Sequence, residues 1–156
     1  MKAIIVYYSK DGVTQKLAEK IREDLQCDIL KVEPAKKYGN FAGTVLRLAG
    51  EMATNTHETA KTPIPNLEEY DVVLLGFPVW AGDMPLFYAD FVEACDLDGK
   101  YVIPFATSGG TSVKQAAVHI RKLCPDARVG MLFDQNRKKK DDYALWIGKL
   151  QGLLCH

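Results

Sequence analysis

Residues 3–15 read AIIVYYSKDGVTQ, and this stretch sets the pattern for the whole chain. The apolar run Ala3–Tyr8 is typical of a buried strand, and the amphipathic run Thr14–Leu25 is typical of a helix. A tight turn that contains Ser9 and Gly12 joins them. The first amides of a helix have no partner inside the helix, and the helix dipole is positive at that end. The turn is therefore a candidate for holding an anion, most often a phosphate.

A second interpretation of this turn stays open, because Ser, Asp, Gly and Thr are also ordinary helix-capping residues. The turn contains neither of the two common nucleotide-binding motifs, G-x-G-x-x-G and G-x-x-x-x-G-K-[ST]. The turn alone does not decide between phosphate binding and plain capping.

The composition is that of a globular chain of 156 residues, and we expect one domain over residues 1–156. The 20 basic and 20 acidic side chains give a net charge of zero, which argues against nucleic acid and acidic membranes as partners. The basic run Arg137–Lys140 is predicted to be a solvated turn. The four cysteines and three histidines show no metal-ligand spacing. Because neither a signal peptide nor a run of transmembrane length is apparent, we expect a cytoplasmic protein.

Strand and helix patterns alternate from end to end. The predicted strands are residues 2–8, 28–32, 71–77, 100–106 and 127–133, and the predicted helices are 14–25, 41–52, 88–95, 113–123 and 143–153. The polar stretch 53–66 is predicted to be a loop. This alternation predicts an α/β three-layer sandwich, in which a five-stranded parallel sheet of order 2-1-3-4-5 has helices on both faces.

Ligands of such sheets bind outside the carboxyl ends of the strands, at the switch point between strands one and three. This rule singles out three loops, which follow strands one, three and four. The second loop, Pro78–Pro85, places Trp80 and Met84 at the end of a buried strand, where a flat aromatic ligand would give the indole a stacking partner. The third, Thr107–Ser112, offers hydroxyls and close backbone approach. Each loop alone can be a plain turn, but three at one sheet edge favour a ligand site.

These residues carry a resemblance to the flavodoxin family, specifically to short flavodoxin-like proteins of anaerobic and fermentative bacteria. The resemblance covers nearly the whole chain. It rests on three stretches: Val6–Ser9 with Gly12 and Thr14; Tyr70-Asp71 followed by Gly76–Trp80, Gly82 and Met84-Pro85; and Phe105–Gly110.

The resemblance implies non-covalent FMN (flavin mononucleotide), with one- or two-electron chemistry supplied by the flavin and tuned by the protein. It assigns three groups of residues. Those of the phosphate loop are Ser9, Lys10, Asp11, Gly12, Val13 and Thr14. Those beside the isoalloxazine ring, near its N5, are Pro78, Val79, Trp80, Ala81 and Gly82. Those at the pyrimidine edge are Thr107, Ser108, Gly109 and Gly110.

Two departures from the family pattern matter. Asp11 stands where a neutral residue is usual, and its carboxylate would repel a phosphate unless it points to solvent or pairs with Lys10 or Lys16. The chain is also neutral, whereas many electron carriers of the family are strongly acidic.

Three functions remain open. The first is electron transfer through FMN to a redox partner protein or a small diffusible acceptor. The second is an FMN-dependent NAD(P)H:quinone-type reductase. The third is an interaction protein of this fold that has lost FMN. A phosphorylated receiver domain is excluded, because the acidic residues that it needs after strands one and three are absent. The sequence leaves the oligomeric state and the redox partner open.

Overall fold

The predicted alternation of strands and helices is confirmed by the structure, a computed structural model that describes residues 1–39, 41–54, 59–138 and 142–156. The strands are β1 (Ala3–Tyr7), β2 (Asp28–Lys31), β3 (Val72–Pro78), β4 (Tyr101–Ser108), β5 (Arg128–Val129) and β6 (Phe133–Asn136). The helices are α1 (Val13–Leu25), α2 (Phe41–Thr54), α3 (Leu86–Ala94), α4 (Lys114–Leu123) and α5 (Tyr143–Leu154).

The strands form one parallel sheet in the predicted order, β2-β1-β3-β4-β5, and β6 also pairs with β4. β1 pairs with β2 on one side and β3 on the other, so that Val6 lies opposite both Leu30 and Leu75. The order of strands therefore changes direction between β1 and β3, as the sequence predicts.

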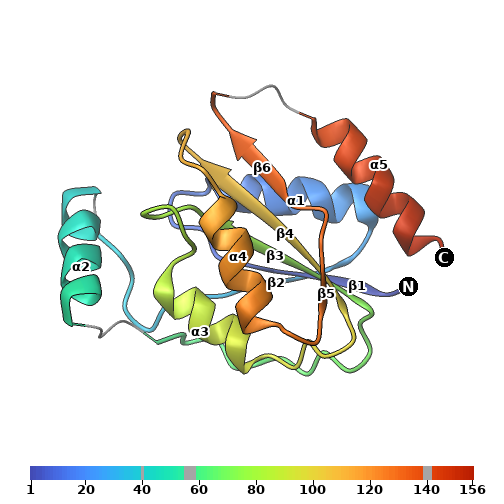
Figure 1. Ribbon diagram of the computed structural model, residues 1–156, viewed down its shortest axis with the longest axis horizontal. Helices are drawn as coiled ribbons and strands as arrows, with labels where there is room; N and C mark the ends of the chain where they lie inside the picture. Colours follow the sequence, from blue (N-terminus) through green and yellow to red (C-terminus); the bar gives the residue numbers. More distant parts are fainter. Residues whose placement is uncertain (40, 55–58, 139–141) are drawn as a thin grey trace.

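Helices cover both faces of the sheet, with α3 and α4 on one side and α1 and α5 on the other (Figure 1). Alternate residues of one strand enter the two cores. Val6 of β1 packs in the core that contains Phe87 of α3, whereas the preceding Ile5 packs in the core that contains Ile21 of α1. Because both faces are covered, β1 and β3 are buried almost throughout, and the unbroken apolar runs follow from this.

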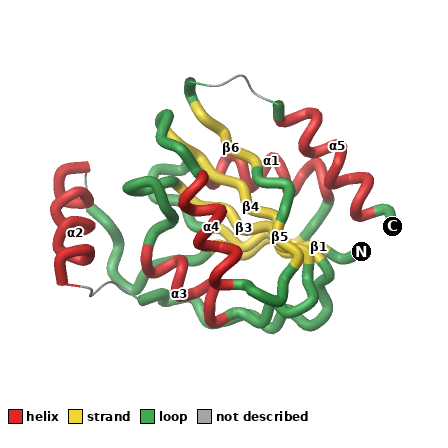
Figure 2. The backbone as a smooth tube through the Cα atoms, in the orientation of Figure 1, coloured by secondary structure: helices red, strands yellow, loops and turns green. Residues whose placement is uncertain are grey.

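The last strand corrects the prediction of one continuous strand over residues 127–133. The structure divides it into β5 and β6, seen as separate yellow segments in Figure 2. Val102 pairs with Val129 but Phe105 pairs with Phe133, so one extra residue forms a bulge between them. Met131 has a positive φ of 53°, and its carbonyl accepts a hydrogen bond from the indole of Trp146 instead of joining the sheet.

Helix α2 stands apart from the two helical layers, at the opposite end of the molecule from the chain termini (Figure 1). Its predicted apolar spacing includes Phe41 and Met52, whose side chains lie outside the described residues. Leu48 packs against the core, whereas Leu46 is 75 % exposed. The buried Glu51 accepts hydrogen bonds from Tyr38 and forms an ion pair with Arg47 at 3.2 Å. A polar network thus holds part of this helix.

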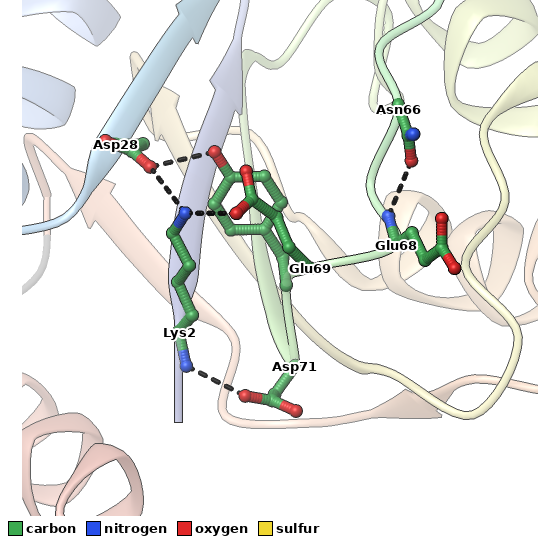
Figure 3. A network of polar contacts seen from close by, with 7 residues as sticks. Lys2, Asp28, Asn66, Glu68, Glu69 and Asp71 are labelled. Carbon is green, nitrogen blue, oxygen red and sulfur yellow. Dashed lines mark hydrogen bonds and ion pairs between the residues drawn. The ribbon is translucent and has the colours of Figure 1, made fainter.

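A second polar network joins β1, β2 and β3 at their amino ends (Figure 3). The Lys2 ammonium contacts Glu69 at 2.6 Å and Asp28 at 3.8 Å, and the Lys2 amide donates to Asp71 at 2.8 Å. The hydroxyl of Tyr70 donates to Asp28, and this bond is the main reason why the pKa of Tyr70 is raised to about 12. Tyr70 and Asp71, which take part in the family resemblance, therefore lie at the edge of the sheet opposite the three candidate loops.

Among the residues that the structure describes, no helix combines the length and apolar character needed to cross a lipid bilayer. None of the described His, Cys, Asp and Glu side chains gather in threes in a way suited to a metal ion.

Candidate functional site

A cavity of about 480 Å³ opens at the carboxyl ends of the central strands. Its walls come from all three candidate loops and from the end of β6. The lining residues are Ser9, Lys10, Asp11, Val13, Thr14, Pro78, Val79, Trp80, Thr107, Ser108, Gly109, Gln135 and Arg137. The structure therefore brings together most of the residues that the sequence singled out.

The first loop is closed by its own hydrogen bond, in which the Gly12 amide donates to the Ser9 hydroxyl at 3.1 Å. Gly12 has a φ of 86°, a conformation that strongly favours glycine, and directly precedes α1. Within the described chain, the amides of Lys10, Asp11, Val13 and Thr14 donate to no acceptor. The loop thus presents unused donors at the positive end of a helix, as an anion site requires.

The Asp11 carboxylate is largely in water, although Asp11 is among the residues that line the cavity. Its side chain is 74 % exposed and pairs with the Lys10 ammonium at 3.1 Å, while Lys10 itself is only 16 % exposed. Two of the alternatives raised for Asp11, solvent exposure and pairing with Lys10, are therefore both present. The repulsion of an anion by this carboxylate is reduced by water and by the adjacent cation.

Thr107 at the end of β4 connects the three loops. Its hydroxyl shares a 2.8 Å hydrogen bond with that of Thr14, and its carbonyl accepts from the Val79 amide at 3.0 Å. Both threonines are buried. Since two hydroxyls share one bond, one O–H of the pair remains a donor that a ligand can use.

Trp80 in the second loop is half-buried and rests on two tyrosines. Its ring meets Tyr8 edge to face at 5.7 Å between centroids and Tyr38 at 4.9 Å. Burial, and then the neighbouring Tyr38, raise the pKa of Tyr8 well above its usual range, so the Tyr8 phenol is neutral at physiological pH. The tyrosines give the indole a fixed place at the cavity wall. Met84, expected near the same loop, is instead buried in the core.

The tip of the second loop is a two-residue turn. Trp80 and Asp83 exchange backbone hydrogen bonds of 2.7 and 3.1 Å, and Ala81 and Gly82 between them have φ values of 52° and 81°. Two successive positive φ angles define a type I′ turn. The predicted site residues that do not line the cavity are Gly12, Ala81, Gly82 and Gly110.

Gln135 and Arg137 line the cavity but are absent from the sequence-based site. The prediction ended the last strand at Phe133, whereas β6 continues to Asn136 beside β4, which carries these side chains to the same sheet edge. Arg137 also belongs to the basic run interpreted as a solvated turn. Its exposure agrees with that interpretation, but its place at the cavity does not. Lys139 and Lys140 lie outside the described residues.

The donor set fits FMN in two respects. A loop with free amides at a helix N-terminus stands at one part of the cavity wall, and a supported indole beside Val79 and Pro78 stands at another. Two small residues, Ser108 and Gly109, also line the cavity. The residues present therefore match a phosphate joined to a flat aromatic ring.

Comparisons with known proteins agree with this arrangement. A flavodoxin family model matches residues 2–150. Flavodoxin 1 of Escherichia coli K12 is 34 % identical over 70 residues, which is 42 % of this chain and 40 % of that protein. The chain thus matches less than half the length of this curated relative.

Solved structures extend the likeness over nearly the whole chain. A candidate flavoprotein of Bacteroides eggerthii is 29 % identical, with a TM-score of 0.80 over 99 % of this chain and 98 % of the other. A Lactobacillus acidophilus flavoprotein, solved in complex with FMN, shares the fold with a TM-score of 0.70 at 22 % identity, over 86 % of this chain and 93 % of the other. Together with the family model, the fold and the site geometry, these matches show that the chain belongs to the flavodoxin family.

Proposed function

We propose that this protein binds FMN non-covalently in the cavity at the carboxyl edge of the sheet and transfers electrons through it. The observation that carries the proposal is the convergence of three loops on one cavity that combines free loop amides with a supported indole. The bound flavin supplies the one- and two-electron chemistry. The protein supplies binding, orientation and the polarity of the surroundings.

Each wall of the cavity has a role in this proposal. The free amides of the first loop hold the phosphate, and the cations of Lys10 and Arg137 favour its charged form. Trp80 and Val79 pack against the ring and keep water from one of its faces. The remaining hydroxyl donor of the Thr14–Thr107 pair lies between these two walls and can serve the sugar-like chain that joins them.

Titration of the apoprotein with FMN tests the proposal directly. We expect the flavin fluorescence to be quenched at a 1:1 ratio, and riboflavin, which lacks the phosphate, to bind more weakly. Trp80→Ala should weaken FMN binding roughly tenfold, equivalent to ~1.4 kcal/mol. Val118→Ala, at a half-exposed position of α4 away from the cavity, is the matched control and should bind like the wild type. Equal binding by all three proteins would contradict the proposed site.

A reductase that uses NAD(P)H and a quinone-type acceptor is the second candidate. It is supported by the zero net charge of the chain and by the exposed Arg137 at the cavity, since a cation there suits an anionic nucleotide. Anaerobic addition of NADPH to the FMN-loaded protein distinguishes the two functions. Rapid bleaching of the flavin colour favours the reductase, whereas a colour that persists until dithionite is added favours an electron carrier.

Absence of FMN binding would reject both redox functions. The chain would then be better described as an interaction protein that keeps this fold. Since a flavodoxin fold alone does not define a function, the binding titration comes before any search for a partner protein.

A further inference from the structure

His119 on α4 does not line the cavity but contacts the second loop at Asp83. Its Nδ1–H donates to the Asp83 carboxylate oxygen Oδ2 at 2.9 Å. The other carboxylate oxygen, Oδ1, accepts the Met84 amide at 2.8 Å. Asp83, whose backbone closes the turn that begins at Trp80, is thus tied to α4 through its side chain.

The turn needs such a link because its conformation is unfavourable for its own sequence. A type I′ turn prefers Asn, Asp or Gly at both central positions, and here the first is Ala81 with a φ of 52°. A non-glycine residue keeps a left-handed conformation only where the surrounding structure imposes it. Asp83 is the position through which α4 does so, since its backbone closes the turn and its side chain binds His119.

Helix α4 is a rigid support for this contact. Ala116 and Ile120 anchor the helix in the core and are fully buried. One turn before His119, the Gln115 side-chain oxygen lies over Gly82, 3.4 Å from the position that a Cβ would take. Two side chains of one anchored helix therefore face two successive residues of the turn, and the side chains of Asp83 and His119 are only 19 % and 30 % exposed.

We propose that His119 is a positioning residue for the flavin: through Asp83 it holds the Trp80–Asp83 turn, and thereby adjusts the reduction potential of the bound FMN. This inference rests on the proposed function, because it concerns the same cavity. A loop that flanks the ring affects oxidised and reduced flavin differently, since their charge and hydrogen bonding differ. We therefore expect that loosening the loop changes the ratio of the two affinities, and with it the potential.

Two substitutions at one position separate the hydrogen bond from the bulk of the side chain. His119→Ala removes the donor to Asp83, whereas His119→Gln keeps an N–H that can reach the carboxylate. Val118→Ala, on the neighbouring and exposed part of the same helix, is the control for α4 itself. The first readout is amide hydrogen exchange at Trp80 and Asp83 in the apoprotein, because both amides donate within the turn. We expect about tenfold faster exchange in His119→Ala and near-wild-type exchange in the other two variants.

The second readout is the two-electron midpoint potential of the FMN-loaded proteins. A tenfold change in the ratio of affinities shifts this potential by about 30 mV, which we expect for His119→Ala and not for His119→Gln or Val118→Ala. An unchanged potential in His119→Ala overturns the inference, whether or not the turn loosens. If the wild type takes up no FMN, the proposed function fails and the flavin role falls with it, while the exchange data still decide separately whether His119 holds the turn.

Discussion

Gly76 of β3 leaves no room for a side chain, and its replacement by alanine tests the packing of the sheet beneath the cavity. A Cβ at this position would lie 2.1 Å from Cζ of Phe105 and 2.4 Å from its Cε2. Gly76 and Phe105 are register partners on β3 and β4, and the ring is fully buried. The ring would have to move by more than 1 Å to restore an ordinary carbon–carbon contact of about 3.5 Å.

The size of the destabilisation depends on how far the Phe105 ring can move. Overpacking of a core costs about 1–3 kcal/mol, and the loss of a whole buried phenyl group, about 3–5 kcal/mol, is an upper limit. Replacing glycine also lowers the entropy of the unfolded chain, which returns about 0.4–1 kcal/mol. We therefore expect Gly76→Ala to lower the free energy of unfolding by about 2 kcal/mol. For a chain of this length that corresponds to a fall in Tm of about 4–8 °C.

Urea unfolding of the apoprotein, followed by circular dichroism, measures this change without any contribution from bound ligand. Gly148→Ala is the matched control, because Gly148 is an exposed position within α5 where a Cβ meets nothing within 4 Å. The same substitution should stabilise the protein there by about 0.5–1 kcal/mol. Opposite signs at the two positions would show that local space decides the outcome.

A double-mutant cycle identifies the contact itself. Phe105→Leu shortens the side chain that meets the new methyl group, so Gly76→Ala should cost little in that background. We expect a coupling of about 1–2 kcal/mol between the two substitutions. The reasoning is refuted if the two costs simply add, or if Gly76→Ala alone is neutral.

Three other predictions concern charge, hydrogen bonding and pH. Asp11→Asn should tighten FMN binding by up to about fivefold in a fluorescence titration, because two like unit charges about 4 Å apart repel each other by about 1 kcal/mol in water; unchanged affinity would place the carboxylate out of range. Tyr88→Phe removes a buried hydroxyl that donates to a β1 carbonyl at 2.8 Å, and should lower the free energy of unfolding in urea by about 0.5–1.5 kcal/mol. Burial raises the pKa of Cys95 to about 12 and that of Cys124 to about 11, above the ordinary 9.0. The stability that these neutral thiols contribute is complete below pH 9 and is lost as the pH rises towards 12, because the unfolded chain releases its protons first; Cys95→Ala should make this fall less steep in urea unfolding at pH 8 to 10.5.

Periodicity and the rules for parallel sheets were sufficient to predict the strand order and the three loops. The apolar runs of β1 and β3 have no alternation because helices cover both faces of the sheet. The same reasoning failed at the last strand. At the bulge in this strand the Met131 carbonyl accepts a hydrogen bond from the indole of Trp146. No local pattern in residues 127–133 predicts a partner that lies so much later in the chain.

The site shows the same division between local and distant information. Ser9 and Thr14, which line the cavity, could be singled out because loop residues beside a strand end have a recognisable composition. Arg137 could not, since its place depends on how far β6 continues beside β4. The His119–Asp83 contact joins α4 to the second loop, and neither residue stands out in its own segment. The sequence therefore does not predict a contact between two distant segments when neither partner belongs to a distinctive local pattern.

The charges around the first loop explain how the Asp11 carboxylate is compatible with a loop that is proposed to hold a phosphate. Lys10 is largely buried at the cavity while its partner Asp11 extends into water, so the cation is the less screened of the two. Arg137 adds a second cation to the lining, and no acidic partner for it occurs among residues 1–39, 41–54, 59–138 and 142–156. The charge that a bound phosphate would meet is then positive even though the chain as a whole is neutral. We therefore expect Asp11 to lower the affinity of such a site for phosphate without abolishing binding, and the overall neutrality of the chain does not argue against an anionic cofactor.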